Sequence, residues 1–125
     1  MNQLHTPKGR RLPPPVRDAS VRIGDWDVGR RPPMALGAEA AGVIEAVRNQ
    51  VSGFAVGDEA MTHPLPLRQD GAWTSTLVAP AALVTRKPTN VSWESAAAFP
   101  VPALTAAHVL EEALGIRSEE CVLVF

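Results

Sequence analysis

The sequence predicts a mainly β domain, a small barrel or sandwich, followed by helices and one strand that belongs to a further sheet. Between residues 38 and 87, short apolar runs alternate with Gly and Pro turns, a pattern typical of a small barrel or sandwich. Residues 93–114 then show helical spacing of apolar side chains. Residues 121–125 are continuously apolar, as a strand buried on both faces of a parallel sheet would be.

The first 17 residues differ from the rest, because they are rich in Pro, Arg and Lys and show no periodicity. We predict an irregular leader over residues 1–17, with polyproline-like local structure. Residues 1–31 hold seven of the 12 basic side chains, and such a basic arm can bind nucleic acid. Because Trp26 is its only aromatic residue, base stacking is not supported. We therefore expect a solvated arm and no nucleic-acid partner.

Four strands are expected in the domain that follows, residues 18–99. They are predicted over residues 41–47, 59–62, 73–78 and 83–86, where apolar and β-forming residues gather. Gly42 inside the first of them suggests a bulge or a close backbone approach. Gly57 suits a tight turn, and the Asp58 side chain can bond backbone amides of that turn.

The helical part begins with Ser92, a favourable N-cap residue, with Glu94 in the first turn that follows. A second helix is predicted over residues 104–114, with Gly115 just past its C-terminus. Residues 100–125 would then form a linker helix and the first strand of a second domain.

Composition excludes several kinds of protein and site. One cysteine allows neither an internal disulfide nor a multi-cysteine zinc site, and Cys121 in its apolar run is expected to be a buried, inert thiol. His108 and Glu111 share a helix face, but no third metal ligand is in view, and His63 is expected to be exposed. The uncharged stretch 95–110 is too short for a membrane span, which needs about 20 apolar residues. Without a signal peptide, we expect a cytoplasmic protein with no membrane partner.

Three segments carry a family resemblance: residues 37–44, 51–59 and 71–73. Together they resemble the N-terminal GroES-like domain of the medium-chain dehydrogenase/reductase superfamily. Residues 102–106 and 121–124 are similar to that superfamily's approach to its nucleotide-binding domain. The resemblance implies a GroES-like, partly open barrel followed by C-terminal helices and the first strand of an otherwise missing Rossmann domain. Since the Gly-rich dinucleotide turn would begin at about residue 125, we expect a truncated chain that is inactive alone.

The resemblance also indicates a branch of the superfamily. Zinc alcohol dehydrogenases have a histidine between the Gly and Glu of the first segment, where this chain has Ala38, which offers no lone pair. The preceding cysteine ligand is also absent, and a catalytic zinc needs about three protein ligands. What remains resembles the zinc-free quinone oxidoreductase and enoyl reductase branch. Its members pass a hydride from NADPH to a quinone or to the activated double bond of an enone.

Site residues follow from the same resemblance. Thr105 matches a threonine near the nicotinamide, although its position also suits a helix N-cap. Asp18 matches the acidic residue of a segment that faces the substrate cleft, in which Pro15 replaces the usual asparagine. Trp26 and Trp73 would line an apolar substrate pocket. Trp73 suits core packing as well.

The residues leave a second class of function open. The chain could be a non-catalytic GroES-like interaction module that pairs with a partner, or with itself, through an exposed terminal strand. Apolar edge strands are prone to such pairing.

Overall fold

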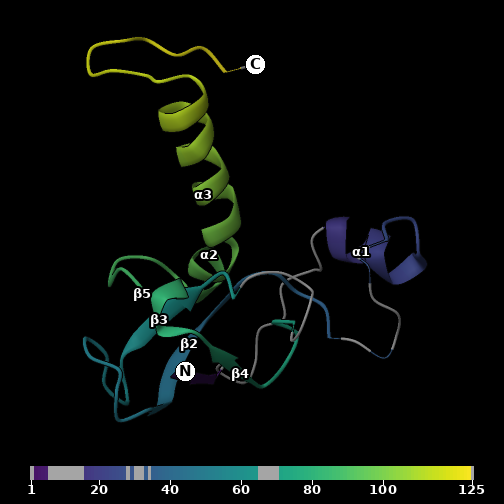
Figure 1. Ribbon diagram of the computed structural model, residues 1–125, viewed down its shortest axis with the longest axis vertical. Helices are drawn as coiled ribbons and strands as arrows, with labels where there is room; N and C mark the ends of the chain where they lie inside the picture. The colour runs from purple at the N-terminus through teal and green to yellow at the C-terminus, as the bar shows by residue number, and fades with distance from the viewer. Residues whose placement is uncertain are drawn as a thin grey trace.

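The computed structural model describes residues 2–5, 16–27, 29, 33, 35–64 and 71–124 (Figure 1). Its strands are β1 (Asn2–His5), β2 (Ala40–Val47), β3 (Glu59–Thr62), β4 (Thr76–Ala79) and β5 (Val84–Arg86). Its helices are α1 (Val16–Ile23), a single 3-10 turn η1 (Ala81–Leu83), α2 (Trp93–Ala98), α3 (Pro100–Ala107) and the π-helical η2 (His108–Ala113). The predicted small β domain with C-terminal helices is confirmed.

The five strands form one antiparallel sheet in the order β4-β1-β2-β3-β5. Strand β2 is the longest and lies at the centre, where it pairs with β1 on one side and β3 on the other. Helix α2 packs on β2, and α3 with η2 rises from that point as a rod that points away from the sheet (Figure 1). The sheet and the helices therefore meet at the N-terminal end of β2, next to residue 39.

Strand β1 corrects the prediction of an irregular leader over residues 1–17. Asn2–His5 pairs with both β2 and β4 and is an interior strand of the sheet. Its sequence, Asn-Gln-Leu-His, contains no β-branched or aromatic residue, so strand propensity is weak and pairing with distant segments decides the conformation. Residues 6–15, which include Pro15, lie outside the described residues, and α1 already begins at Val16.

The bulge in β2 lies away from the expected glycine. Gly42 pairs regularly with Ala60. The register with β1 shifts instead between Ile44 and Ala46, which leaves Glu45 as the extra residue. Glu45 is exposed, so the irregularity falls where no core side chain is displaced.

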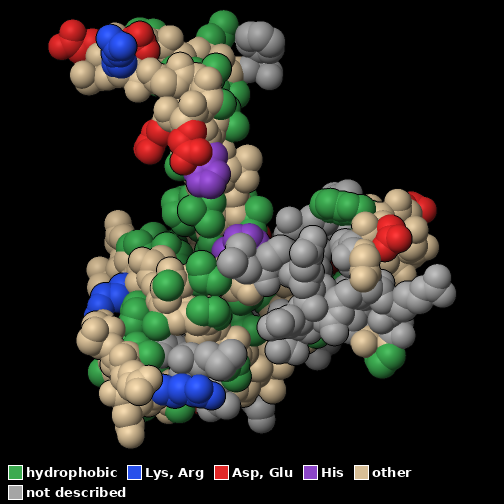
Figure 2. Space-filling model, in the orientation of Figure 1, with side chains coloured by type: hydrophobic (Ala, Val, Ile, Leu, Met, Phe, Trp, Pro, Cys, Tyr) green, Lys and Arg blue, Asp and Glu red, His purple; other side chains and the backbone are tan. Residues whose placement is uncertain are grey.

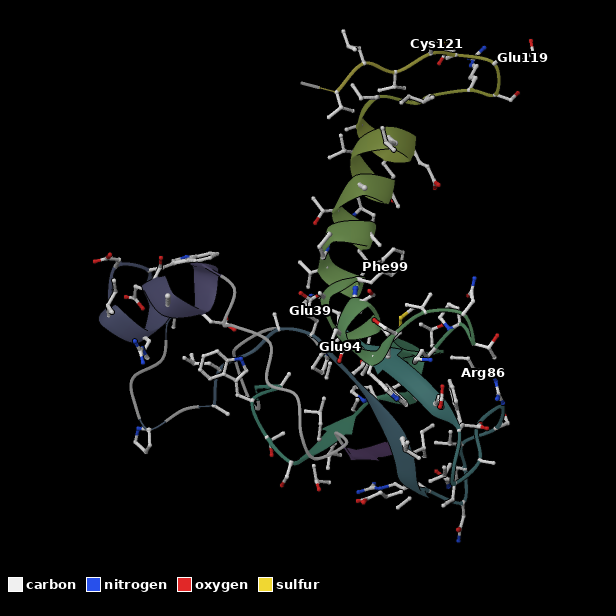
Figure 3. All side chains as sticks on the ribbon, turned by 180° about the vertical axis from the view of Figure 1, so that it is seen from behind. Glu39, Arg86, Glu94, Phe99, Glu119 and Cys121 are labelled. Atoms are coloured by element: carbon white, nitrogen blue, oxygen red, sulfur yellow. The ribbon has the colours of Figure 1, made fainter. Side chains whose placement is uncertain are left out.

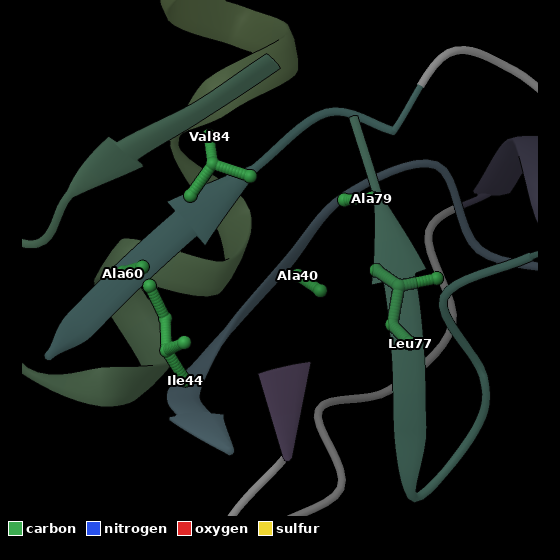
Figure 4. Packing of buried hydrophobic residues seen from close by; sticks show 6 residues of the cluster. All are labelled: Ala40, Ile44, Ala60, Leu77, Ala79 and Val84. Atoms are coloured by element: carbon green, nitrogen blue, oxygen red, sulfur yellow. The ribbon is translucent and has the colours of Figure 1, made fainter. Parts of the chain in front are cut away.

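Two apolar clusters lie on opposite sides of the sheet. The first combines side chains of four strands and contains Ala40, Ile44, Ala60, Leu77, Ala79 and Val84 (Figure 4). The second contains Ala41, Met61 and Ala96 and joins β2 and β3 to α2. Successive side chains of a strand point to opposite faces, which is why the neighbours Ala40 and Ala41 belong to different clusters.

The structure confirms the predicted start of one helix and corrects the predicted start of the next. The Ser92 hydroxyl accepts a hydrogen bond from the Ser95 amide at 3.1 Å, so Ser92 is the N-cap of α2. The second helix begins at Pro100 rather than residue 104, because proline is well tolerated in a first helical turn, where an amide has no intrahelical partner. The rod ends at Gly115, whose φ of +60° is left-handed. No helix in the described part of the chain has the length and apolarity needed to cross a membrane.

The predicted terminal strand is wrong for the residues described. Residues 121–124 form no strand and lie beyond the far end of the helical rod, away from the sheet (Figure 1). An apolar run becomes a strand only beside a hydrogen-bonding neighbour, and none of the five described strands pairs with this one. Cys121 is consequently exposed rather than buried.

A buried lysine joins the end of β5 to α2. The Lys87 side chain is only 5% exposed, and its ammonium donates to Glu59 Oε2 at 2.9 Å and to the Pro88 carbonyl at 3.2 Å. The same ammonium lies 4.8 Å from the centre of the Trp93 ring. One charged group therefore holds two strands and the first residue of α2 together.

Replacing Lys87 with methionine is expected to lower the free energy of unfolding by about 2 kcal/mol, through loss of the cation–π contact and the charged hydrogen bonds. The loss stays moderate because Glu59 is 48% exposed and can be solvated. Urea unfolding of K87M, W93L and the double variant measures the effect and the Lys87–Trp93 coupling. Additive single effects would contradict the contact.

The turn before β3 behaves as predicted. Gly57 has a φ of +95°, and Asp58 Oδ2 accepts the Ala55 amide at 2.8 Å. Arg86 pairs with the same oxygen at 3.0 Å. The Ala55 amide, and then Arg86, lower the pKa of Asp58 against the opposing effect of desolvation.

A lowered folded-state pKa means that Asp58 contributes stability above its unfolded pKa, and that this contribution disappears as the pH falls through the folded value. We expect the stability difference between the wild type and Asp58→Asn to be constant near neutral pH and to shrink below about pH 4. Urea unfolding of both proteins across the acid range provides the measurement. A difference that stays the same down to the lowest pH would contradict the role of the charge.

Candidate functional site

Three consecutive residues, 37–39, connect the sheet to three other parts of the chain, and we call them the junction. Each member makes its own hydrogen bond to a segment distant in sequence. The partners are the loop before β4, the residue after β3 and the first turn of α3. The junction therefore sets how these segments lie around the entrance to β2.

Gly37 holds the loop before β4. Its carbonyl accepts the Ala72 amide at 2.9 Å, and the Trp73 amide donates to Leu36 at 2.8 Å. The φ of Gly37 is +94°, and a Cβ here would lie 2.6 Å from Trp73 Cδ1. The indole thus packs against a position that only glycine can occupy.

Trp73 is 49% exposed, which contradicts a role in the core. The part of the indole near Gly37 is in contact, and about half of the side chain stays open to solvent. An exposed flat ring beside backbone suits contact with a planar ligand.

Ala38 is buried, and its carbonyl contacts Nδ1 of His63. His63 is half-buried, so the expectation that it is exposed is wrong. The contact requires Nδ1–H to donate, which leaves Nε2 as the acceptor of the neutral ring. Sequence reasoning missed His63 because its partner lies 25 residues away along the chain.

Glu39 lies at the foot of α3 (Figure 3). Its Oε2 accepts the Val101 amide at 2.8 Å, across 62 residues of sequence. A carboxylate at a helix N-terminus satisfies an otherwise unpaired donor and is favoured by the helix dipole.

Thr105 follows Val101 by one turn on the exposed side of α3. Its hydroxyl donates to the Val101 carbonyl at 2.8 Å, so it lies inside the helix and the N-cap alternative is wrong. With its proton engaged, the hydroxyl oxygen still has a lone pair that can accept a hydrogen bond.

The other two predicted site residues lie on or beside α1. Asp18 is fully buried in the first turn of that helix, and Trp26, in the turn after it, is 48% exposed. Figure 1 shows α1 to one side of the sheet, apart from α3. The structure therefore brings Trp73 and the helix of Thr105 to the junction, and it places Asp18 and Trp26 on a separate element.

Charged side chains are unevenly placed on the face shown in Figure 2, where acidic groups gather on the helical rod and beyond it. His108 and Glu112 on η2 approach to 4.0 Å, one turn apart. Among the described residues, no group of three or more His, Cys, Asp or Glu side chains is arranged to hold a metal ion.

A small antiparallel sheet followed by helices is the architecture of the N-terminal GroES-like domain of the medium-chain dehydrogenase/reductase fold. The family model of the alcohol dehydrogenase GroES-like domain matches residues 16–89, and the chain belongs to this family.

Known proteins with a similar sequence or fold support this placement. The human protein named synaptic vesicle membrane protein VAT-1 homolog-like is 33% identical over 107 residues, which cover 86% of this chain and 25% of the human protein. The crystal structure of quinone oxidoreductase from Pseudomonas syringae pv. Tomato DC3000 matches with a TM-score of 0.72 and 30% identity, over 93% of this chain and 34% of that one. Escherichia coli quinone oxidoreductase, solved in complex with NADPH, matches with a TM-score of 0.74 and 25% identity, over 95% of this chain and 34% of that one. The chain thus spans about a quarter to a third of the length of these relatives.

Proposed function

We propose that this chain is the N-terminal, substrate-side part of a zinc-independent, NAD(P)H-dependent oxidoreductase that reduces quinones or enones, and that these 125 residues are inactive alone. The observation that carries the proposal is Ala38. This buried methyl group occupies the position at which, by the family resemblance, zinc alcohol dehydrogenases have a histidine ligand. Similarity to two quinone oxidoreductases supports the substrate class.

The cofactor would supply the hydride, and the described residues fit only its nicotinamide end. There, the free lone pair of Thr105 can accept an N–H of the carboxamide. The first turn of α3 does not suit the pyrophosphate, because Pro100 and Pro102 have no N–H and Val101 already donates to Glu39. The negative charge of Glu39 would also repel a phosphate at this point. We therefore propose that the phosphates are bound by the part of the enzyme that this chain does not span.

The substrate would use the open part of Trp73. A quinone ring is flat and largely apolar, and offset stacking on an indole is favourable. By family resemblance, we propose that the exposed Trp26 also contacts the substrate, and that Asp18, which is fully buried in α1, supports this helix from within. The residues that bind the phosphates would decide whether NADPH or NADH is the hydride donor.

Two titrations of the purified chain test the proposal. Calorimetry with NADPH is expected to show no binding. Tetramethyl-1,4-benzoquinone, whose fully substituted ring resists addition by Cys121, is expected to shift the NMR signals of the Trp73 indole and the Gly37 amide. Tight NADPH binding would refute the claim that the chain is inactive for want of a nucleotide site. Unchanged Trp73 and Gly37 signals would refute the substrate site.

A non-catalytic interaction module is the second candidate, and one observation favours it. The rod and the segment beyond it expose apolar side chains that include Leu104, Val109, Leu114, Leu123 and Val124. Such a surface is typical of a partner-binding region. Analytical ultracentrifugation separates the two candidates: a discrete oligomer supports the module, and polydisperse aggregates support the separated part of an enzyme.

A further inference from the structure

The first turn of α3 has an unusual set of backbone donors. Pro100 and Pro102 have no N–H, and the Ala103 amide already donates to the Phe99 carbonyl at 2.9 Å. Val101 therefore holds the one N–H among the first three residues of this helix, and Glu39 accepts it. A single side chain, from the residue just before β2, thus accepts the one available amide in the first turn of the helix.

Glu39 is itself firmly held. It directly precedes Ala40 and Ala41, which are buried in the clusters on the two faces of the sheet. Its neighbour Ala38 is 3% exposed and bonded to His63. The carboxylate therefore starts from one of the best-packed stretches of backbone in the domain, and its hydrogen bond to Val101 is partly buried.

The rod beyond this point has little other support. Pro100 is the only buried residue of α3, and η2 has none, while Leu104 and Val109 are 48% and 46% exposed. A helix held only at its foot takes its direction from the contacts made there. Those contacts are the packing of α2 and Pro100, and the bond from Glu39.

We infer that Glu39 is a positioning residue that fixes the direction of α3 relative to the sheet. Thr105 lies one turn from Val101, so the same bond sets where its hydroxyl lies relative to the junction and Trp73. The importance of Thr105 rests on the proposed function. The effect of Glu39 on the helix does not, because it follows from the hydrogen bond and the burial alone.

NMR of the full 125-residue chain tests this inference without nucleotide or substrate. In Glu39→Ala, exchange of the Val101 amide proton is expected to accelerate about tenfold. Residual dipolar couplings of residues 103–113 should change while those of the sheet stay as in the wild type. Glu39→Gln should restore most of the helix direction, because its amide oxygen can accept the same bond. The matched control is Glu111→Ala on the exposed surface of η2, which should change neither measurement.

A second signature remains available if Glu39→Ala does not fold. In Glu39→Gln, the proton shift of the Val101 amide should move upfield from its wild-type position, because a hydrogen bond to a carboxylate is stronger than one to a neutral amide oxygen. An amide shift that is independent of Glu39, or an unchanged helix direction in Glu39→Ala, overturns the inference. Failure of NADPH or quinone to behave as proposed would leave these results unaffected, so the two proposals can fail separately.

Discussion

Replacing Gly71 with alanine is expected to lower the free energy of unfolding by about 3 kcal/mol or more, the upper range for overpacking at a rigid site. An added Cβ would lie 2.2 Å from the Leu36 carbonyl oxygen and 2.5 Å from the Ala35 carbonyl carbon. Both obstacles are backbone atoms, so a side-chain rotation cannot relieve the clash. The segments 35–37 and 71–73 must therefore move apart. The Ala72 and Trp73 amides then lose their hydrogen-bond acceptors.

Gly115→Ala is the matched control, because it makes the same chemical change in open space. Its φ of +60° still disfavours alanine, and we expect a loss of about 1 kcal/mol from that strain alone. Urea unfolding with constant m-values measures both variants. Equal losses at the two positions would show that the close approach of the two loops does not constrain residue 71.

Truncating Ile44 to alanine is expected to cost about 3 kcal/mol, because the side chain is fully buried and the cavity left behind cannot collapse. Ile44 is the largest fully buried side chain of a cluster in which Ala40, Ala60 and Ala79 contribute only methyl groups (Figure 4). Small neighbours on strands that are hydrogen-bonded to one another have little freedom to move into the space. Chemical unfolding monitored by tryptophan fluorescence gives the value.

Val56→Ala provides the comparison for an apolar truncation at the surface. Val56 is 66% exposed, and a change within about 0.5 kcal/mol is expected. If Ile44→Ala proved as mild as Val56→Ala, the cluster on this face of the sheet would not be the core that stabilises the domain.

Local sequence predicted much of the β domain because its signals act over a few residues. Gly57 with Asp58, Ser92 as N-cap and Gly115 past the last helix all have local partners or local dihedral requirements, and the structure confirms each. Strands β2, β3 and β5 also lie where apolar runs bounded by turns indicated them.

Two elements were placed wrongly for opposite reasons. Asn2–His5 lacks strand propensity but pairs on both sides, whereas residues 121–124 have the apolar composition of a buried strand and pair with no described strand. Pairing between distant segments outweighed composition in both cases.

The candidate site was only partly predictable. The Gly-x-Glu pattern at residues 37–39 drew attention to the right segment, and Trp73 does pack beside it. The hydrogen-bond partners of that segment are distant in sequence: His63 lies 25 residues from Ala38, and Val101 lies 62 residues from Glu39. A single sequence carries no signal for contacts at that range.

The sequence by itself determined the family, the position of the turns and caps, and the absence of a side-chain metal ligand at Ala38, because each depends on which atoms a residue carries or on its nearest neighbours. Only the tertiary structure decided that β1 lies inside the sheet, that Trp73 is half open, and that Glu39 holds the foot of α3. Those outcomes depend on hydrogen bonds and packing between segments far apart in the chain. Such contacts form only when the whole domain has folded and their partners are brought together.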